Sequence, residues 1–236
     1  AAQPFGDEEQ VLFAFKSGGK HPEAMGHCHA DVNSFVLCAG GDRLLWDGGY
    51  YDSYGSPHHN GYSRKSEAHN VLMLDGEGQL VHARGVHGHI SRYEADGTDV
   101  IVESDASHPL VYGARLARYV RRATLNGLKE LVIEDDILSR DAVTMSLLLH
   151  SVFPIVYDPG TKTLRITGEK YLLDGRLETG EPINAVITTA FEQPPNLSSH
   201  LLDTFNEYPE QCRLELRTAR KLSKWQPRLT FTWRRL

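Results

Sequence analysis

The sequence has few cysteines, no long apolar run and no excess of basic residues. Three cysteines are an odd number, which excludes a framework of paired disulfides but leaves a single bridge open. No run approaches the ~20 apolar residues of a membrane span, and residues 1–4 carry no signal-peptide pattern. The formal charge of −6 argues against a nucleic-acid-binding surface. An anionic ligand would therefore be held by local Arg and His groups.

Short apolar or alternating runs separated by turn residues recur along the chain. The 236 residues can bury a sizeable core, as one large all-β domain or two smaller ones. The runs have roughly the spacing of a β-sandwich. We therefore expect an all-β protein, a large antiparallel β-sandwich of ten or more strands with minimal helix. The expected strands are 11–15, 34–39, 43–46, 71–74, 100–102, 116–124, 130–134, 142–151, 163–167, 185–189, 213–217 and 229–233.

Two segments between these runs differ from the rest. Residues 48–66 are rich in Gly, Ser, Tyr, Asn and His and contain Pro57, which predicts a long functional loop. Residues 201–208 give the one hint of a short helix. Turns are expected at Gly40-Gly41-Asp42, Asp75-Gly76, Asn126-Gly127, Asp158-Pro159-Gly160 and Asp174-Gly175.

His27, His29 and Asp31 alternate along the chain. In a strand, all three would project from one face. Two imidazoles and a carboxylate are costly to bury unless they are paired or bind a metal. Zinc accepts these donors, commonly as three protein ligands and a water. The alternative is a hydrogen-bonded strand end in which Asp31 accepts from backbone amides.

Two further polar residues stand at strand ends. Asp47 follows an apolar run and precedes two glycines, where a carboxylate is often only a turn former. His69 stands at the start of another apolar run, where a lone histidine is more often hydrogen-bonded than a ligand. Together with His29, however, they predict a common site.

The remaining polar side chains favour structural interpretations. Arginines beside strand residues predict a solvated face, a histidine pair in the loop predicts exposure, and a histidine within an apolar run predicts a hydrogen-bonded core position. These residues are Arg118, Arg121 and Arg122, then His58 and His59, and finally His150.

In chain order, the polar residues and their neighbours form one pattern. It reads His27-x-His29-x-Asp31-x-x-Ser34-Phe35, then Leu45-x-Asp47-x-Gly49-x-Tyr51, Arg64, His69-Asn70-Val71 and Asp75-Gly76. This pattern resembles the C-terminal β-domain of the heparinase II/III-like polysaccharide lyases, an architecture that alginate and oligoalginate lyases share. Support further along the chain comes from Arg121-Arg122, residues 131–135 and Leu149-His150.

The resemblance implies a fold and a metal. Residues 1–236 would be a single β-sandwich domain, and residues 1–25 do not resemble the helical toroid that precedes this domain in those lyases. His29, Asp47 and His69 would be the ligands of a zinc ion that orders the site and need not touch the substrate.

The resemblance also implies catalytic and substrate-binding residues. His27 would face the substrate cleft and neutralise a uronate carboxylate or handle its proton. Tyr51 or Tyr54 would line the same cleft as acid or base. Arg64 could pair bidentately with a carboxylate or sulfate, and His58 could touch the substrate.

The implied reaction is β-elimination in a uronic-acid-containing polysaccharide or oligosaccharide. The implied partners are that acidic saccharide and an N-terminal helical toroid, and the implied location is periplasmic or secreted. Two alternatives remain open: a non-catalytic carbohydrate-binding or structural sandwich, and a uronate epimerase, which returns the proton instead of expelling the leaving group.

Overall fold

The computed structural model describes residues 9–18, 28–48, 52–81, 88–196 and 211–236 of the chain. Three sheets make up the fold, and every pair of neighbouring strands in them is antiparallel. The expected all-β class is confirmed. None of the helices in the described ranges is long and apolar enough to cross a membrane.

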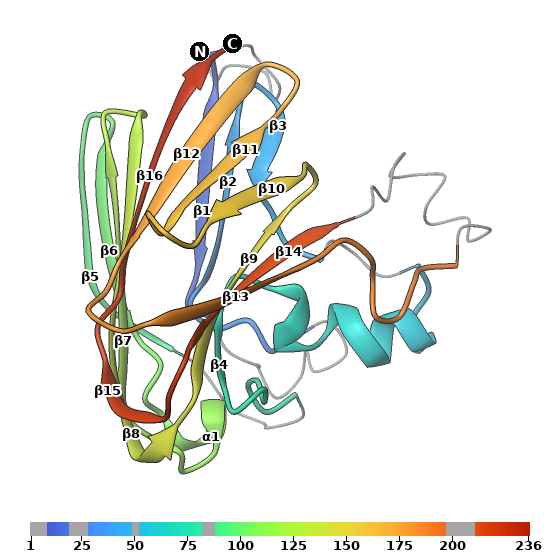
Figure 1. Cartoon of the computed structure of the whole chain (residues 1–236), viewed down its shortest axis with the longest axis vertical. Coiled ribbons are helices and arrows are strands. Elements are labelled where there is room, and N and C mark those ends of the chain that lie inside the picture. Colours follow the sequence, from blue (N-terminus) through green and yellow to red (C-terminus); the bar gives the residue numbers. More distant parts are fainter. Residues whose placement is uncertain (1–8, 19–27, 49–51, 82–87, 197–210) are drawn as a thin grey trace.

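The largest sheet has nine strands and includes the long strands along one side of the molecule (Figure 1). The strand β15 (Leu222–Trp225) pairs with β8 outside the main order. In order, the others are β10 (Ile155–Asp158), β11 (Thr163–Thr167), β12 (Tyr171–Glu178), β16 (Arg228–Arg235), β8 (Glu130–Val143), β7 (Leu116–Asn126), β6 (Asp99–Asp105) and β5 (His89–Asp96).

A backbone bridge joins the two smaller sheets. The Trp46 amide donates to the His150 carbonyl, which joins β3 of one sheet to β9 of the other. Residues 34–45 form the expected hairpin, with Gly40 and Gly41 at positive φ in its turn. The three-stranded sheet is β1 (Val11–Lys16), β2 (Ser34–Ala39) and β3 (Asp42–Leu45). The four-stranded sheet is β13 (Ile183–Thr188), β14 (Cys212–Thr218), β9 (Met145–Ser151) and β4 (Leu72–Leu74).

One hydrophobic core joins the sheets. Phe35 of β2 lies with its ring centroid 6.4 Å from that of Phe231 on β16. Leu37 of β2, Leu173 of β12 and Leu149 of β9 belong to the same cluster, and each is at most 1% exposed. Burying a side chain of this size contributes about 1.5–3 kcal/mol. The small sheets are therefore held against the large one by close packing.

Residues 48–66 are less irregular than expected. They contain the π-helix η2 (His59–Ser63), and the 3-10 helix η3 (Ser66–Ala68) follows. Gly48 lies against η3, where an added Cβ would stand 2.6 Å from the Cβ of Ala68. A short α-helix, α1 (Pro109–Tyr112), precedes β7. The expected helix over residues 201–208 lies outside the described residues.

The strand predictions were wrong in several places. Asp174-Gly175, expected as a turn, lies inside β12. An added Cβ at Gly175 would come within 3 Å of Leu164 and Phe231, so this glycine serves close packing. The expected strand 142–151 is divided between the end of β8 and β9. Four strands were not predicted, namely β5, β10, β12 and β15.

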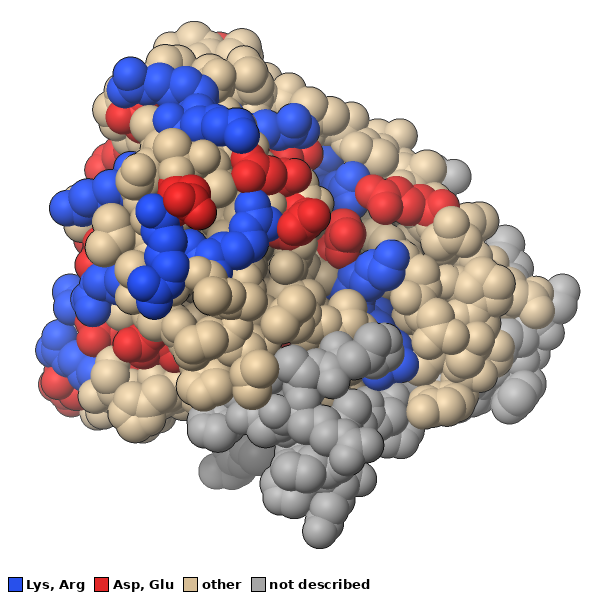
Figure 2. Space-filling model, turned by 90° about the horizontal axis from the view of Figure 1, so that it is seen from below, with Lys and Arg blue, Asp and Glu red and all other residues tan. Residues whose placement is uncertain are grey.

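The visible surface carries no stripe of one charge. Figure 2 shows Lys and Arg side chains interspersed with Asp and Glu over the described part of this face. Exposed ion pairs such as Arg118–Asp136 and Arg165–Asp174 set opposite charges side by side on the surface of the protein.

Candidate metal centre

His29 and Asp31 lie in the irregular segment before β2, not in a strand as the alternation suggested. The backbone of Ala30, between them, is held from both sides. Its amide donates to the Arg64 carbonyl (2.9 Å), and its carbonyl accepts from Ser66 Oγ (2.7 Å). These bonds replace strand pairing and turn the segment toward η3. His27 lies outside the described residues.

Asp47 and His69 are brought together at the junction of the two small sheets. Asp47 follows Trp46, whose amide bonds to β9, and His69 follows η3. The buried Asn70 side chain donates to the carbonyls of Phe35 and Trp46, both at 2.7 Å. Its Oδ1 accepts from the backbone amide of His150 (2.8 Å). Asn70 thus fixes the start of β4 against the segment that ends in Asp47.

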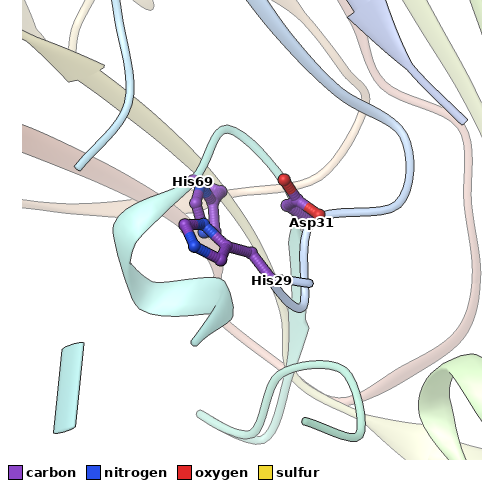
Figure 3. A group of neighbouring side chains, drawn as sticks. All are labelled: His29, Asp31 and His69. Carbon is purple, nitrogen blue, oxygen red and sulfur yellow. The ribbon is translucent and has the colours of Figure 1, made fainter. Parts of the chain in front are cut away.

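Four side chains from three segments converge at this junction. His29, Asp31 and His69 each offer a ligand atom, and these atoms lie within 4.8 Å of one another (Figure 3). The imidazole centroids of His29 and His69 are 5.2 Å apart. His69 Nδ1 lies 3.5 Å from Asp47 Oδ2. The structure thus brings the predicted His29 and His69 together with Asp31, and places the predicted Asp47 beside His69.

The two imidazoles are in different electrostatic states. Burial and the neighbouring His69 lower the pKa of His29 to about 4, so His29 is neutral at pH 7. Burial alone would lower the pKa of His69, but the nearby carboxylates of Asp47 and Asp31 raise it above its usual value. His69 therefore has the more negative surroundings.

This donor set fits zinc. Imidazole nitrogens and carboxylate oxygens are the ligands that zinc takes, and a neutral His29 can donate its lone pair without first losing a proton. Two carboxylates could complete the set. Asp31 Oδ2 is bound by Lys16 Nζ at 2.7 Å, whereas its buried Oδ1 has no hydrogen-bond partner among the described residues.

The surface beside this cluster is hollowed. A depression of about 190 Å³ is lined in part by Lys16, Asp31 and Asp47. The larger hollow of about 660 Å³ lies over β10–β12 and β16 and contains none of the candidate residues. We regard the smaller depression as the approach to the site because candidate ligand residues line it, whereas none lines the larger hollow.

The other predicted site residues have mixed placements. Tyr54 is 63% exposed, with its ring centroid 5.0 Å from that of His59. Arg64 is 8% exposed, and its Nη1 lies 3.5 Å from Asn60 Oδ1. Tyr51 lies outside the described residues.

The expected exposure of the histidine pair is wrong. His58 and His59 are both 0% exposed. His58 packs against the rings of Tyr62 and Phe191, and its Nδ1 lies 2.6 Å from the Gln193 carbonyl oxygen. Phe191 and Gln193 are more than a hundred positions away from His58 in the chain, so the local sequence alone did not reveal this burial.

Arg121 does not lie on a solvated face as expected. Its side chain is 2% exposed and forms a two-pronged ion pair with Asp135. The signal that could have found it is the pairing of β7 with β8, which sets Arg121 opposite Asp135. His150 is confirmed as a hydrogen-bonded core histidine, with Nε2 2.8 Å from the Glu67 carbonyl oxygen.

Comparison with solved structures shows the same fold in larger proteins. A heparinase III shares 15% identity over 94% of this chain and 33% of its own, with a TM-score of 0.71. The heparan sulfate lyase HepC from Pedobacter heparinus shares 12% identity over the same fractions, also with a TM-score of 0.71. At these identities the likeness shows the fold alone. The chain spans about a third of the length of these structures.

Comparison with protein sequences gives the family. No curated protein matches the chain significantly. The family model described as "Heparinase II/III-like, C-terminal" matches residues 6–216, which is most of the chain and includes all the candidate ligands. The chain therefore belongs to the heparinase II/III-like family and corresponds to its C-terminal domain.

Proposed function

We propose that this chain is the zinc-binding β-sandwich domain of a polysaccharide lyase that cleaves uronic-acid-containing polysaccharide or oligosaccharide by β-elimination. The observation that supports the proposal is the approach of His29, Asp31 and His69 to within 4.8 Å of one another, with Asp47 Oδ2 3.5 Å from His69 Nδ1, in a heparinase II/III-like domain. In this proposal His29, Asp47 and His69 hold the zinc ion. When bound, the ion supplies positive charge and a fixed point that orders the segments around it.

Asp31 has a supporting part in the proposal. Its ion pair with Lys16 links the ligand-bearing segment to the end of β1. Its charge, together with that of Asp47, favours a cation at His69. We assign Asp47 as the carboxylate ligand because the family pattern places it there. Asp31, whose carboxylate lies within 4.8 Å of a nitrogen of each imidazole, is then a neighbouring negative charge.

The substrate determines what the catalytic residues must do. β-Elimination removes the proton α to the uronate carboxyl group and expels the glycosidic oxygen at C4. That proton is too weakly acidic to leave unless the carboxylate charge is neutralised. His27 would neutralise the carboxylate or take the proton, and Tyr51 or Tyr54 would act as base or protonate the leaving oxygen. Tyr54 is suited to this role because it is exposed.

Arg64 and His58 are weaker candidates for substrate contacts. Arg64 would pair with a carboxylate or sulfate, and His58 would contact the saccharide. Both are buried among the described residues, so either contact requires the segment around η2 to open.

The proposed partners are an acidic polysaccharide or oligosaccharide and a helical N-terminal domain. The proposed location is periplasmic or secreted. One structurally similar protein is a heparan sulfate lyase, so heparan sulfate is the first substrate to test and alginate the second.

The test is a lyase assay on the natural polypeptide that carries this chain. It is incubated with each polymer and followed by the near-ultraviolet absorbance of unsaturated uronate. Absorbance that grows with time, and falls ~10²-fold or more in Tyr54→Phe if Tyr54 is the acid or base, supports the proposal. Solvent-proton exchange without absorbance would indicate an epimerase. Saccharide affinity with neither signal would indicate a binding module.

A further inference from the structure

Arg121 is a buried arginine whose guanidinium has two kinds of partner. On one edge, Nε and Nη2 each donate to an oxygen of Asp135 at 2.7 Å. The two side chains are 2% and 1% exposed. Asp135 stands opposite Arg121 in the β7–β8 pair, so this ion pair is anchored in the large sheet.

The other edge of the guanidinium reaches both segments that carry the candidate histidines. Nη1 donates to the Asn33 carbonyl at 2.7 Å and to the Asn70 carbonyl at 2.8 Å. Asn33 ends the segment that holds His29 and Asp31, and it has a positive φ of 65°. Asn70 directly follows His69. One nitrogen atom therefore links the two halves of the metal centre.

A structural role for the ion pair would not by itself explain this arrangement. A buried ion pair is often no more stabilising than apolar residues of the same volume, because both charges lose their hydration. What Arg121 offers is a rigid fork with five donors. Its fork satisfies the Asp135 carboxylate and still leaves a nitrogen for the two carbonyls.

Other hydrogen bonds also hold the segment that carries His29 and Asp31. Ser66 Oγ donates to the Ala30 carbonyl, and the Gln79 side chain bonds the backbone of Val32. These residues belong to the η3 segment and the chain after β4. The Asn33 side chain also donates to the Ser104 carbonyl of β6 at 3.3 Å, but Arg121 of β7 bonds both histidine-bearing segments at once.

We propose that Arg121, held by Asp135, is a positioning residue that sets the His29 segment and the His69 segment at the spacing a metal ion needs. This inference rests on the proposed zinc site. Arg121 acts through the backbone of Asn33 and Asn70, and it touches neither metal nor substrate. Groups that orient metal ligands in this way typically change metal affinity by about 10–100-fold.

The test replaces both members of the pair, as Arg121→Met with Asp135→Leu. Removing both charges leaves no unpaired buried ion, so the variant is expected to fold. Its zinc dissociation constant, measured by competition with a chromophoric chelator, should rise about 10–100-fold. The variant also leaves the Asn33 and Asn70 carbonyls without this donor, at a cost of about 1–3 kcal/mol each. Thermal unfolding of the metal-free protein measures that loss, and zinc affinity is compared at a temperature at which both proteins are folded.

The control is Arg122→Met with Glu103→Leu. Arg122 is the next residue on β7, and its ion pair with Glu103 is partly exposed, at 43% and 23%. Because successive strand residues face opposite sides, this pair lies away from the metal centre. Its removal should change zinc affinity by less than about twofold, as expected for a surface ion pair.

Each outcome decides a separate point. Wild-type protein that binds no zinc overturns the proposed metal site itself. A folded Arg121→Met, Asp135→Leu variant with wild-type zinc affinity overturns the positioning role and leaves the metal site standing. If that variant does not fold, Arg121→Lys decides. Lysine keeps a charge beside Asp135 but lacks the fork, so a folded lysine variant must bind zinc more weakly, and unchanged affinity contradicts the inference.

Discussion

Replacing Asn70 with alanine would remove the side chain that joins the two small sheets at the metal centre. Asn70 is 0% exposed. Its amide group donates to the carbonyls of Phe35 and Trp46 and accepts from the amide of His150, at distances of 2.7–2.8 Å. Asn70→Ala therefore leaves three backbone groups without this partner in the protein interior.

The size of the effect follows from those three groups. A buried polar group that loses its partner costs about 1–3 kcal/mol, which gives roughly 3–9 kcal/mol for the set. Water entering the vacated space would restore some of the bonds. We expect the free energy of unfolding to fall by about 3–6 kcal/mol, which is a large part of the ~5–15 kcal/mol that folded domains have.

Urea unfolding of the metal-free protein measures this loss. The midpoint should fall by more than 1 M at an unchanged slope, since typical slopes are about 1–3 kcal/mol per molar. Asn126→Ala is the matched control, because Asn126 also uses its amide in a 2.8 Å bond, but at the exposed turn after β7. It should change stability by less than about 0.5 kcal/mol. A loss below about 1 kcal/mol for Asn70→Ala would refute the reasoning.

Three further predictions concern pH, metal and packing. Burial lowers the pKa of His150 to about 3, below its unfolded value near 6.5. Between these two pH values the unfolded state binds more protons than the folded state. The free energy of unfolding should therefore fall as pH falls, by up to ~1.4 kcal/mol per pH unit. The measurement is the stability difference between wild type and His150→Gln from pH 7 to 4, and a difference that does not vary with pH contradicts it. In a solution whose free zinc is about 100 times the dissociation constant, bound zinc contributes ~2.7 kcal/mol to the stability of the folded state. Removing that zinc with a chelator should therefore lower the melting temperature by about 5–10 °C. An unchanged melting temperature contradicts zinc binding. Gly175→Ala should lower the free energy of unfolding by about 1–3 kcal/mol through overpacking, since its Cβ would come within 3 Å of side chains. Gly180→Ala is the control, because an added Cβ there has nothing within 4 Å, and it should show no such loss of stability.

Much of the fold could be predicted where short apolar runs lie between turn residues. The hairpin of residues 34–45 and the strands β7 and β9 stand out because apolar residues recur in short runs between Gly- and Asn-containing turns. The strand β5 was missed because all eight of its residues are exposed, so its sequence has no apolar face. The length of β8 was underestimated because Asp136 and residues 139–141 interrupt the apolar residues of its second half.

The donor residues of the candidate site could be predicted from the sequence, but the residues that hold those donors in place could not. His29, Asp47 and His69 could be named because a family pattern carries them. Arg121 could not be identified as buried, because its burial depends on Asp135 of the neighbouring strand β8 and on backbone carbonyls 88 and 51 residues away in the chain. The bonding role of Asn70 could not be predicted for the same reason, because its three backbone partners come from separate parts of the chain. Long-range backbone contacts of this kind leave no periodicity in the sequence.

The most direct test of the central claim is the zinc content and ligand environment of the purified chain. The account predicts about one zinc per molecule, with nitrogen and oxygen ligands alone in its X-ray absorption spectrum. That zinc should be lost in His29→Ala, Asp47→Ala and His69→Ala and kept in Asp31→Asn. Unchanged zinc in the first three variants, or a sulfur ligand from a cysteine, would contradict it.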